Sequence, residues 1–349
     1  MYRGVTYALL AAVLFGASTP FAKALVSDVH PLLMAGLLYA GSGVGLAVTL
    51  LLRAILTRKT VTTAWPARGE WRWLVAAIVF GGVLGPVLLM FGLVATSAST
   101  ASLLLNLEGV FSALLAWFLF HENYDRRIAL GMAAIVAGGA VLSFTGGGIG
   151  VSPGATLIVA ACLCWALDNN LTRKVAASDA IVIAGLKGIV AAVVNLGLAL
   201  ALGYTMPTTK VVAQAAAVGF LGYGLSLVLF VLALRHLGTA RAGAYFAAGP
   251  FVGALVAVAL LGDAVTLPLL VAALLMGFGI WLHLTERHDH EHVHDAMDHV
   301  HAHRHDEHHQ HAHRFDWDGA EPHTHAHEHP ATAHRHRHFP DVHHRHPHG

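Results

Sequence analysis

Three ionisable residues stand in stretches of sequence that are otherwise apolar, and they are the strongest candidates for chemistry in this chain. Glu108 lies within SLLLNLEGVFSALLAWFLF, Asp168 within the apolar run 154–176, and Lys187 within the run 180–203. A charged side chain at bilayer depth costs at least a few kcal/mol unless it is paired, neutralised or hydrated. Such residues typically line substrate paths or relay protons, so we expect these three to serve transport.

Helical spacing separates the polar residues near Glu108. At about 100° per residue, Asn106 and Glu108 lie on nearly opposite helix faces, so only one can point squarely at a central path. We favour Glu108, because a carboxyl group that desolvation keeps partly protonated can take up and release a proton. A protonated glutamate bonded to a neighbouring helix is the alternative, and Asp168, beside Asn169, leaves the same choice open. Lys187 either pairs with one of these acids or contacts substrate.

The composition determines which elements must position these residues. The chain has 349 residues, of which 56% are hydrophobic and 12% charged, and its mean hydropathy is +0.62. A single soluble core cannot bury so much apolar surface, so the sequence predicts an all-α integral membrane protein. Ten stretches have roughly the 17 to 25 residues that a transmembrane helix needs. They lie near 5–25, 31–56, 72–95, 97–120, 127–145, 154–176, 180–203, 211–234, 239–261 and 266–285.

Positive charge predicts the orientation of these helices. Lys and Arg gather at alternate ends of the stretches, as the positive-inside rule requires of cytoplasmic ends. These cytoplasmic residues are Arg3, Arg53, Arg58, Lys59, Arg68, Arg72, Arg126, Arg127, Arg173, Lys174, Arg235, Arg241 and Arg287. We therefore expect a multi-pass protein of the cell (inner) membrane with both termini in the cytoplasm.

An internal repeat relates the two halves of the chain. GVTYALLAAVLFGASTPFAKAL from Gly4 resembles GATLIVAACLCWALDNNLTRKV from Gly154, which aligns Ser18 and Thr19 with Asp168 and Asn169. Each half holds five stretches, an odd number, so the second half enters the membrane from the opposite side. Inverted repeats are typical of alternating-access transporters, which bind substrate between the halves. Ser18 and Thr19 therefore join Asn106, Glu108, Asp168, Asn169 and Lys187 as candidate substrate-binding residues.

Two longer segments resemble the EamA-type members of the drug/metabolite transporter superfamily. They read GVFSALLAWFLFHENYDRRIALGMAAIVAGGAVL and GPFVGALVAVALLGDAVTLPLLVAALLMGFGIWL, and the resemblance covers about residues 4–285. Pro250 matches a proline common early in the ninth helix of the family, whereas Gly109 stands at the matching place in the first half. The resemblance implies two inverted five-helix repeats and a secondary transporter, most simply an exporter of small organic metabolites or drug-like molecules.

The C-terminal segment has a different composition. All but four of the 27 histidines follow residue 286, in a low-complexity sequence that begins RHDHEHVHDAMDHVHAHRH. So few apolar residues cannot form a core, so we expect disorder. Alternating histidines suit zinc, nickel, cobalt or copper in many interchangeable sites. The candidate ligands are His288, His290, His292, His294, His299, His301, His303 and His305. A repeat expansion without a role in the cell and a pH-sensing tail are the alternatives.

These observations predict three segments and leave two classes of function open. The segments are a first repeat over 1–146, a second repeat over 154–285 and a cytoplasmic tail over 286–349. The first class is a secondary transporter, with a divalent-metal transporter as its variant; the second is a non-transporting membrane metal sensor. The sequence has no P-loop and no enzyme motif. We expect no required cofactor and no nucleic-acid partner. The expected partners are a small-molecule substrate, the lipid bilayer and metal ions bound to the tail, and a homodimer is kept as an alternative.

Overall fold

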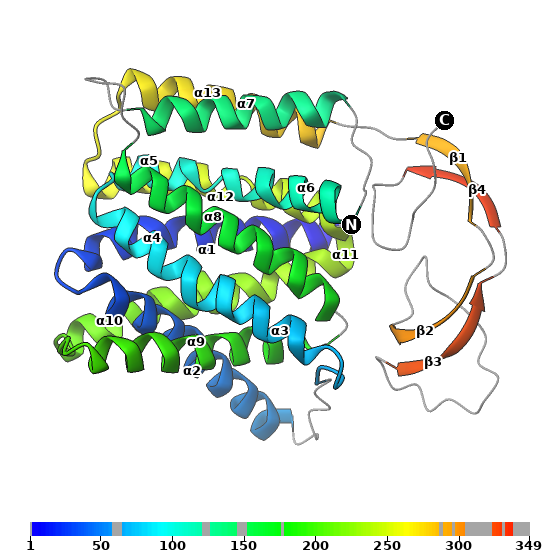
Figure 1. Cartoon of the computed structure of the whole chain (residues 1–349), viewed down its shortest axis with the longest axis horizontal. Helices are drawn as coiled ribbons and strands as arrows, with labels where there is room; N and C mark the ends of the chain where they lie inside the picture. The colour runs from blue at the N-terminus through cyan, green and yellow to red at the C-terminus, as the bar shows by residue number, and fades with distance from the viewer. Residues whose placement is uncertain are drawn as a thin grey trace.

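The computed structural model is a bundle of membrane-length helices with four short strands outside it (Figure 1). It describes the following residues: 2–57, 65–120, 126–144, 152–175, 178–285, 289–294, 297–303, 323–329 and 332–337. Within them, ten helical segments are long and apolar enough to cross a membrane. This confirms the all-α membrane fold and the ten spans that the sequence predicts.

Each half of the bundle supplies five spans. The first half contains α1 (Tyr2–Val26), α2 (Pro31–Thr57), α3 (Trp71–Ala77), η1 (Ile78–Leu84), α4 (Gly85–Val94), α5 (Ala98–Leu104), α6 (Leu107–Phe120) and α7 (Arg126–Ser143). The second contains α8 (Pro153–Thr172), η2 (Arg173–Val175), α9 (Ala180–Ala201), α10 (Thr209–Gly219), η3 (Phe220–Leu225), α11 (Ser226–Phe246), α12 (Gly249–Val256), η4 (Ala257–Leu261) and α13 (Leu267–Leu284).

The third and eighth spans are each interrupted by a π-helical segment. In the third span η1 separates α3 from α4, and in the eighth η3 separates α10 from α11. Both segments are rich in glycine, with the sequences IVFGGVL and FLGYGL. A π-helical turn leaves backbone carbonyl groups outside the regular bonding pattern, which is why such turns often occur at functional sites. The repeat therefore carries the same irregularity in both halves.

The fourth span is not the continuous helix that the apolar run predicts. Between α5 and α6 the amides of Leu105 and Asn106 donate to carbonyls three residues back, at 3.2 and 3.1 Å. The ninth span breaks in the same way between α11 and α12, where the amide of Ala248 donates to the carbonyl of Tyr245 at 3.2 Å. Both breaks precede a helix that begins near a glycine. The break lies directly before Glu108, so the local geometry there differs from that of an ideal helix.

The two halves pack through helices that correspond in the repeat. Helix α2 packs on α9, and α7 packs on α13; α1 contacts α11 and α12, while α8 contacts α4 and α6. Small residues allow these close approaches, since a Cβ built on Gly188 would lie 2.6 Å from the amide nitrogen of Gly43. Large apolar residues such as Leu38 and Leu89 fill the core between the halves and are fully buried.

The strands belong to the histidine-rich segment. β1 (Asp289–His294) pairs with β4 (Thr332–Arg337), and β2 (Met297–His303) pairs with β3 (His323–His329), both antiparallel. They differ from the disorder that the composition predicts, and the alternation of histidine with other residues is the pattern that favours a strand. An isolated two-stranded ladder is at best marginally stable in water. The buried apolar side chains of the described residues lie in the helical bundle.

Candidate functional site

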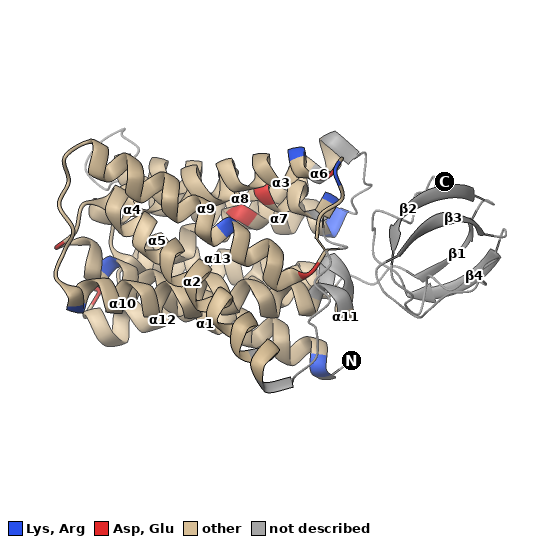
Figure 2. Cartoon of the chain, turned by 90° about the horizontal axis from the view of Figure 1, so that it is seen from below, with Lys and Arg blue, Asp and Glu red and all other residues tan. Residues whose placement is uncertain are grey.

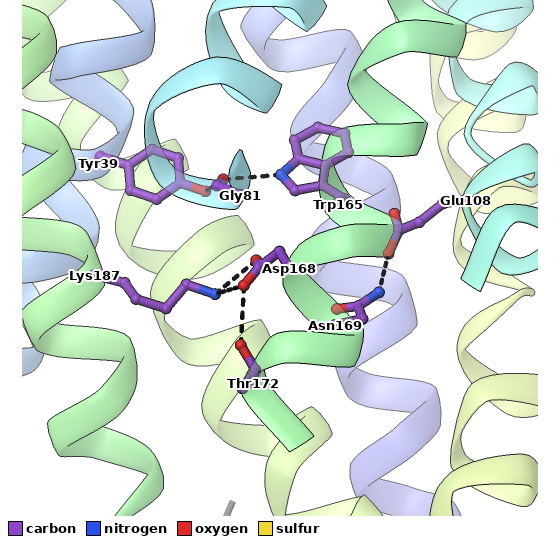
Figure 3. Close-up of polar contacts among 8 residues, drawn as sticks. All are labelled: Tyr39, Gly81, Glu108, Trp165, Asp168, Asn169, Thr172 and Lys187. Carbon is purple, nitrogen blue, oxygen red and sulfur yellow. Dashed lines mark hydrogen bonds and ion pairs between the residues drawn. The ribbon is translucent and has the colours of Figure 1, made fainter. Parts of the chain in front are cut away.

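Asp168 and Lys187 form a buried ion pair inside the second half (Figure 3). The Nζ of Lys187, on α9, lies 2.6 Å from each carboxylate oxygen of Asp168, on α8. The hydroxyl group of Thr172, one turn along α8, donates to Asp168 Oδ1 at 2.9 Å. Both charged side chains are less than a tenth exposed. The sequence leaves two roles open for Lys187, and in the structure Lys187 pairs with an acid, Asp168.

The π-helical segment η1 makes room for this pair. A Cβ on Gly81 would lie 1.9 Å from Asp168 Oδ2, so the carboxylate can occupy its position only because residue 81 is glycine. The Gly81 carbonyl accepts two hydrogen bonds, from the hydroxyl of Tyr39 at 2.6 Å and from the indole Nε1 of Trp165 at 3.0 Å (Figure 3). One irregular carbonyl thus joins the second, third and sixth spans beside the ion pair.

Glu108 lies in the first turn of α6, where the fourth span restarts after its break. Its Oε1 accepts a hydrogen bond from the side-chain amide of Asn169, on α8, at 2.7 Å (Figure 3). Both side chains are half-buried. Because the positive end of a helix dipole lies at the N-terminus, this position also favours a carboxylate. The bond joins the first half to the second, which the Asp168–Lys187 pair does not.

Helix α8 therefore carries the polar site on two faces. Asp168 faces α9 and η1, and Asn169 faces α6. The next residue, Asn170, donates to the carbonyl of Ser112 at 3.3 Å and to that of Ala166 at 2.9 Å. Each of the three polar residues that interrupt the apolar sequence of α8 thus forms a hydrogen bond or an ion pair with a neighbouring helix.

The remaining sequence candidates lie elsewhere. Asn106 is buried, donates to the sulfur of Met276 on α13 at 3.7 Å, and its Oδ1 accepts no hydrogen bond within the described residues. The structure thus places Asn106 and Glu108 against different neighbours, as their spacing predicts. Ser18 and Thr19 are also buried, and the Ser18 hydroxyl donates to the carbonyl of Phe15 at 2.6 Å. None of these three joins the polar group around Asp168.

Ser18 nevertheless occupies the position in the first half that Asp168 occupies in the second. A Cβ on Gly222, in η3, would lie 2.3 Å from the Cβ of Ser18, just as Gly81 in η1 adjoins Asp168. Each half thus contains a glycine niche in a π-helical segment, filled by a side chain of the first helix of the other repeat. Only the niche at Gly81 holds a charged group.

Tyr39, Trp165, Thr172 and Gly81 belong to the site but are not among the residues that the sequence singles out. The glycine pair in FGGVLG is the signal that could have found Gly81, since adjacent glycines within a helical run indicate a bend or a close approach. Trp165 aligns with Phe15 in the repeat, and their rings lie edge to face with centroids 6.2 Å apart. Tyr39 and Thr172 carry no pattern of their own, because only tertiary packing brings them to the ion pair.

The described residues that form this site include none of the candidate histidines. Among residues whose side chains are described, no three of His, Cys, Asp and Glu gather closely enough to hold a metal ion. His288 and His305 lie outside the described residues. The other candidates lie on strands of which only the backbone is described: His290, His292 and His294 on β1, and His299, His301 and His303 on β2.

Comparison with known proteins agrees with the two-repeat helical fold. The model of the EamA-like transporter family matches residues 2–144 and again residues 152–285. An "Uncharacterized transporter" from Methanothermobacter thermautotrophicus is 28% identical over 288 residues, which cover 78% of this chain and 84% of that protein. A solved structure described as "Crystal structure of protein" aligns with a TM-score of 0.61 at 19% identity, over 79% of this chain and 95% of the other, and shows the same fold. The chain belongs to the EamA-like transporter family, in the drug/metabolite transporter superfamily, and its general function is transport across a membrane.

Proposed function

We propose that the protein is a secondary transporter that exports small organic molecules by alternating access, with Glu108 as its proton-exchanging group. One half moves relative to the other in such a mechanism, and substrate binds where the halves meet. The residues proposed to line the path are Glu108 and Asn169, with Asp168 and Lys187 beside them. Asn106, Ser18 and Thr19 are proposed as further lining of the path, although they lie apart from this polar group.

The hydrogen bond between Glu108 and Asn169 is the observation that supports the proposal most strongly. It crosses from the first half to the second, so a rocking motion of the halves must change it. A charge-assisted bond to a carboxylate is stronger than a bond to a neutral carboxyl group. Protonation of Glu108 therefore weakens one contact between the halves, which gives a physical link between proton binding and movement.

Proton flux through reconstituted protein tests this function. Full-length protein in phosphatidylcholine vesicles with trapped pyranine would be given a panel of amino acids, nucleosides and organic amines, and lumenal pH would be followed under an imposed pH gradient. We expect at least one compound to drive proton movement, and Glu108→Gln to abolish that movement at every pH. Asp179→Asn, which changes a carboxylate at the N-terminus of α9, is the matched control. A Glu108→Gln protein with unchanged, equally pH-dependent flux would contradict the proposal.

The orientation and the tail complete the proposed function. Figure 2 shows more Lys and Arg at the end of the bundle that carries the N-terminus than at the opposite end, which supports a cytoplasmic N-terminus in the cell membrane. For the tail we propose binding of zinc, nickel, cobalt or copper. In its support, the register of β2 and β3 sets His299 opposite His327 and His301 opposite His325. Opposite residues in an antiparallel ladder lie on the same face.

A metal ion as cargo and a sensor without transport are weaker alternatives. The described helices bring together carboxylate, amide and hydroxyl groups but no three close metal ligands. Membership of a transporter family favours transport over a purely sensory role. We therefore propose organic cargo for the helices and metal ions for the tail.

A further inference from the structure

Of the three ionisable side chains near the centre of the bundle, Asp168 and Lys187 are paired with each other, whereas Glu108 is not paired with a cation. Asp168 and Lys187 cancel each other, because both carboxylate oxygens lie 2.6 Å from the lysine nitrogen. Glu108 instead has a neutral partner, because its Oε1 accepts from the side-chain amide of Asn169. A half-buried carboxylate at bilayer depth that has no cation beside it is stabilised by gaining a proton or by a cation from outside. Glu108 is thus the uncompensated acid of this polar group.

The ion pair is well placed to act on Glu108 through space. Asp168 directly precedes Asn169, the residue that binds Glu108, so α8 carries both contacts in adjacent positions. A unit charge at a distance of roughly 10 Å changes a proton affinity by about tenfold at an effective dielectric constant of about 20. An intact pair exerts little net effect, whereas a broken pair exposes a full charge of one sign or the other.

We infer that the Asp168–Lys187 pair is a positioning element that sets the pH at which Glu108 exchanges its proton, by keeping the neighbouring net charge at zero. The inference rests on the proposed role of Glu108 and adds how that role is tuned. A merely structural ion pair predicts loss of stability when either partner is replaced. Tuning instead predicts that the titration midpoint of Glu108 shifts in one direction when Asp168 is replaced and in the other when Lys187 is replaced. Packing defects do not produce opposite shifts of this kind.

The other ionisable groups near Glu108 do not reverse the direction of these expected shifts. The groups that interact electrostatically with Glu108 are Cys162 and Asp168 on α8, Lys187 on α9 and Tyr39 on α2. Helix α7, which also packs on α6, carries ionisable side chains only in its first turn, at Arg126 and Arg127. Cys162 and Tyr39 are neutral as thiol and phenol near neutral pH, so the Asp168–Lys187 pair holds the two charges that a substitution can unbalance.

Infrared spectroscopy of the full chain in phosphatidylcholine vesicles tests the inference with the proton itself as probe. The band of protonated carboxyl groups is followed against pH, and the part that disappears in Glu108→Gln is assigned to Glu108. Asp168→Asn leaves an unpaired lysine cation that favours the carboxylate, so the titration midpoint should fall by about one pH unit. Lys187→Gln leaves Asp168 without its cation. Over the pH range in which Asp168 is ionised, it favours the protonated form of Glu108, so the Glu108 midpoint should rise by a similar amount.

The double variant Asp168→Asn/Lys187→Gln separates tuning from damage. It holds no unbalanced charge, so its midpoint should return to within about half a unit of the wild-type value, even if a single variant assembles poorly. Shifts of the same sign in both single variants, no shift in either, or a double variant displaced as far as a single variant would overturn the inference. A different result would contradict the proposed function but not the inference. In that case the Glu108 midpoint shifts in the variants as expected, while Glu108→Gln leaves proton flux unchanged.

Discussion

At the scale of single residues, the site depends on one missing methyl group. Asp168 reaches Lys187 because residue 81 has no side chain, and the Gly81 carbonyl in turn holds Tyr39 and Trp165. The charges of the site are evident in the sequence as acids and a lysine in apolar runs. The glycine that admits them is marked in the sequence only as one of an adjacent pair, and its role appears only when η1 and α8 are brought together.

Gly81→Ala should therefore damage the site although it adds only one carbon atom. The new Cβ would lie 1.9 Å from a carboxylate oxygen, so either the ion pair or the π-helical segment must shift. Overpacking of this kind typically costs about 1–3 kcal/mol. Thermal unfolding of the purified protein in one detergent measures the loss. Gly197→Ala is the control, since a Cβ there meets nothing within 4 Å; equal melting temperatures for the two variants would refute the assignment.

At the scale of elements, irregular turns distinguish this bundle from ten plain helices. The sequence predicts the number, order and approximate limits of the spans, because length and hydrophobicity alone decide them. It does not predict η1, η3 or the breaks that precede α6 and α12, because their contacts form only in the folded bundle, as when Asp168 lies against Gly81 and Ser18 against Gly222. Spacing on an ideal helix still separated Asn106 from Glu108 correctly, although a break lies between them.

The close helix contact between the halves gives a prediction at this scale. Gly188→Ala should force α9 away from α2, because its Cβ would lie 2.6 Å from the amide nitrogen of Gly43. In membranes such close approach contributes much of the stability of helix packing. Gly185→Ala, one turn earlier on α9, places a Cβ 3.8 Å from Leu46 and should be tolerated. The two variants are compared by the fraction of monodisperse protein recovered after heating. Equal recovery would show that the close contact of Gly188 with Gly43 is unimportant for stability.

At the scale of the whole molecule, the helical bundle and the histidine-rich segment should act separately. A chain that ends at Glu286 keeps all ten spans, so we expect its proton flux to equal that of the full chain. It should lose nearly all binding of zinc, nickel, cobalt and copper, measured by elemental analysis after equilibrium dialysis. If metal binding stayed with the shortened chain, the helices would hold the metal. If flux were lost with the tail, the tail would be part of the transport mechanism.

The paired niches also bear on how such a chain could have arisen. Because α2 packs on α9 and α7 on α13, each half offers the other the surface that it receives, which is the geometry of a two-fold dimer. Two equal subunits would have carried two equal niches. In this chain one niche holds Ser18 and the other holds Asp168 with its lysine. After duplication and fusion, a single covalent chain can thus keep the symmetry of its scaffold while its chemistry diverges to one side, an option closed to a homodimer, whose every substitution appears twice.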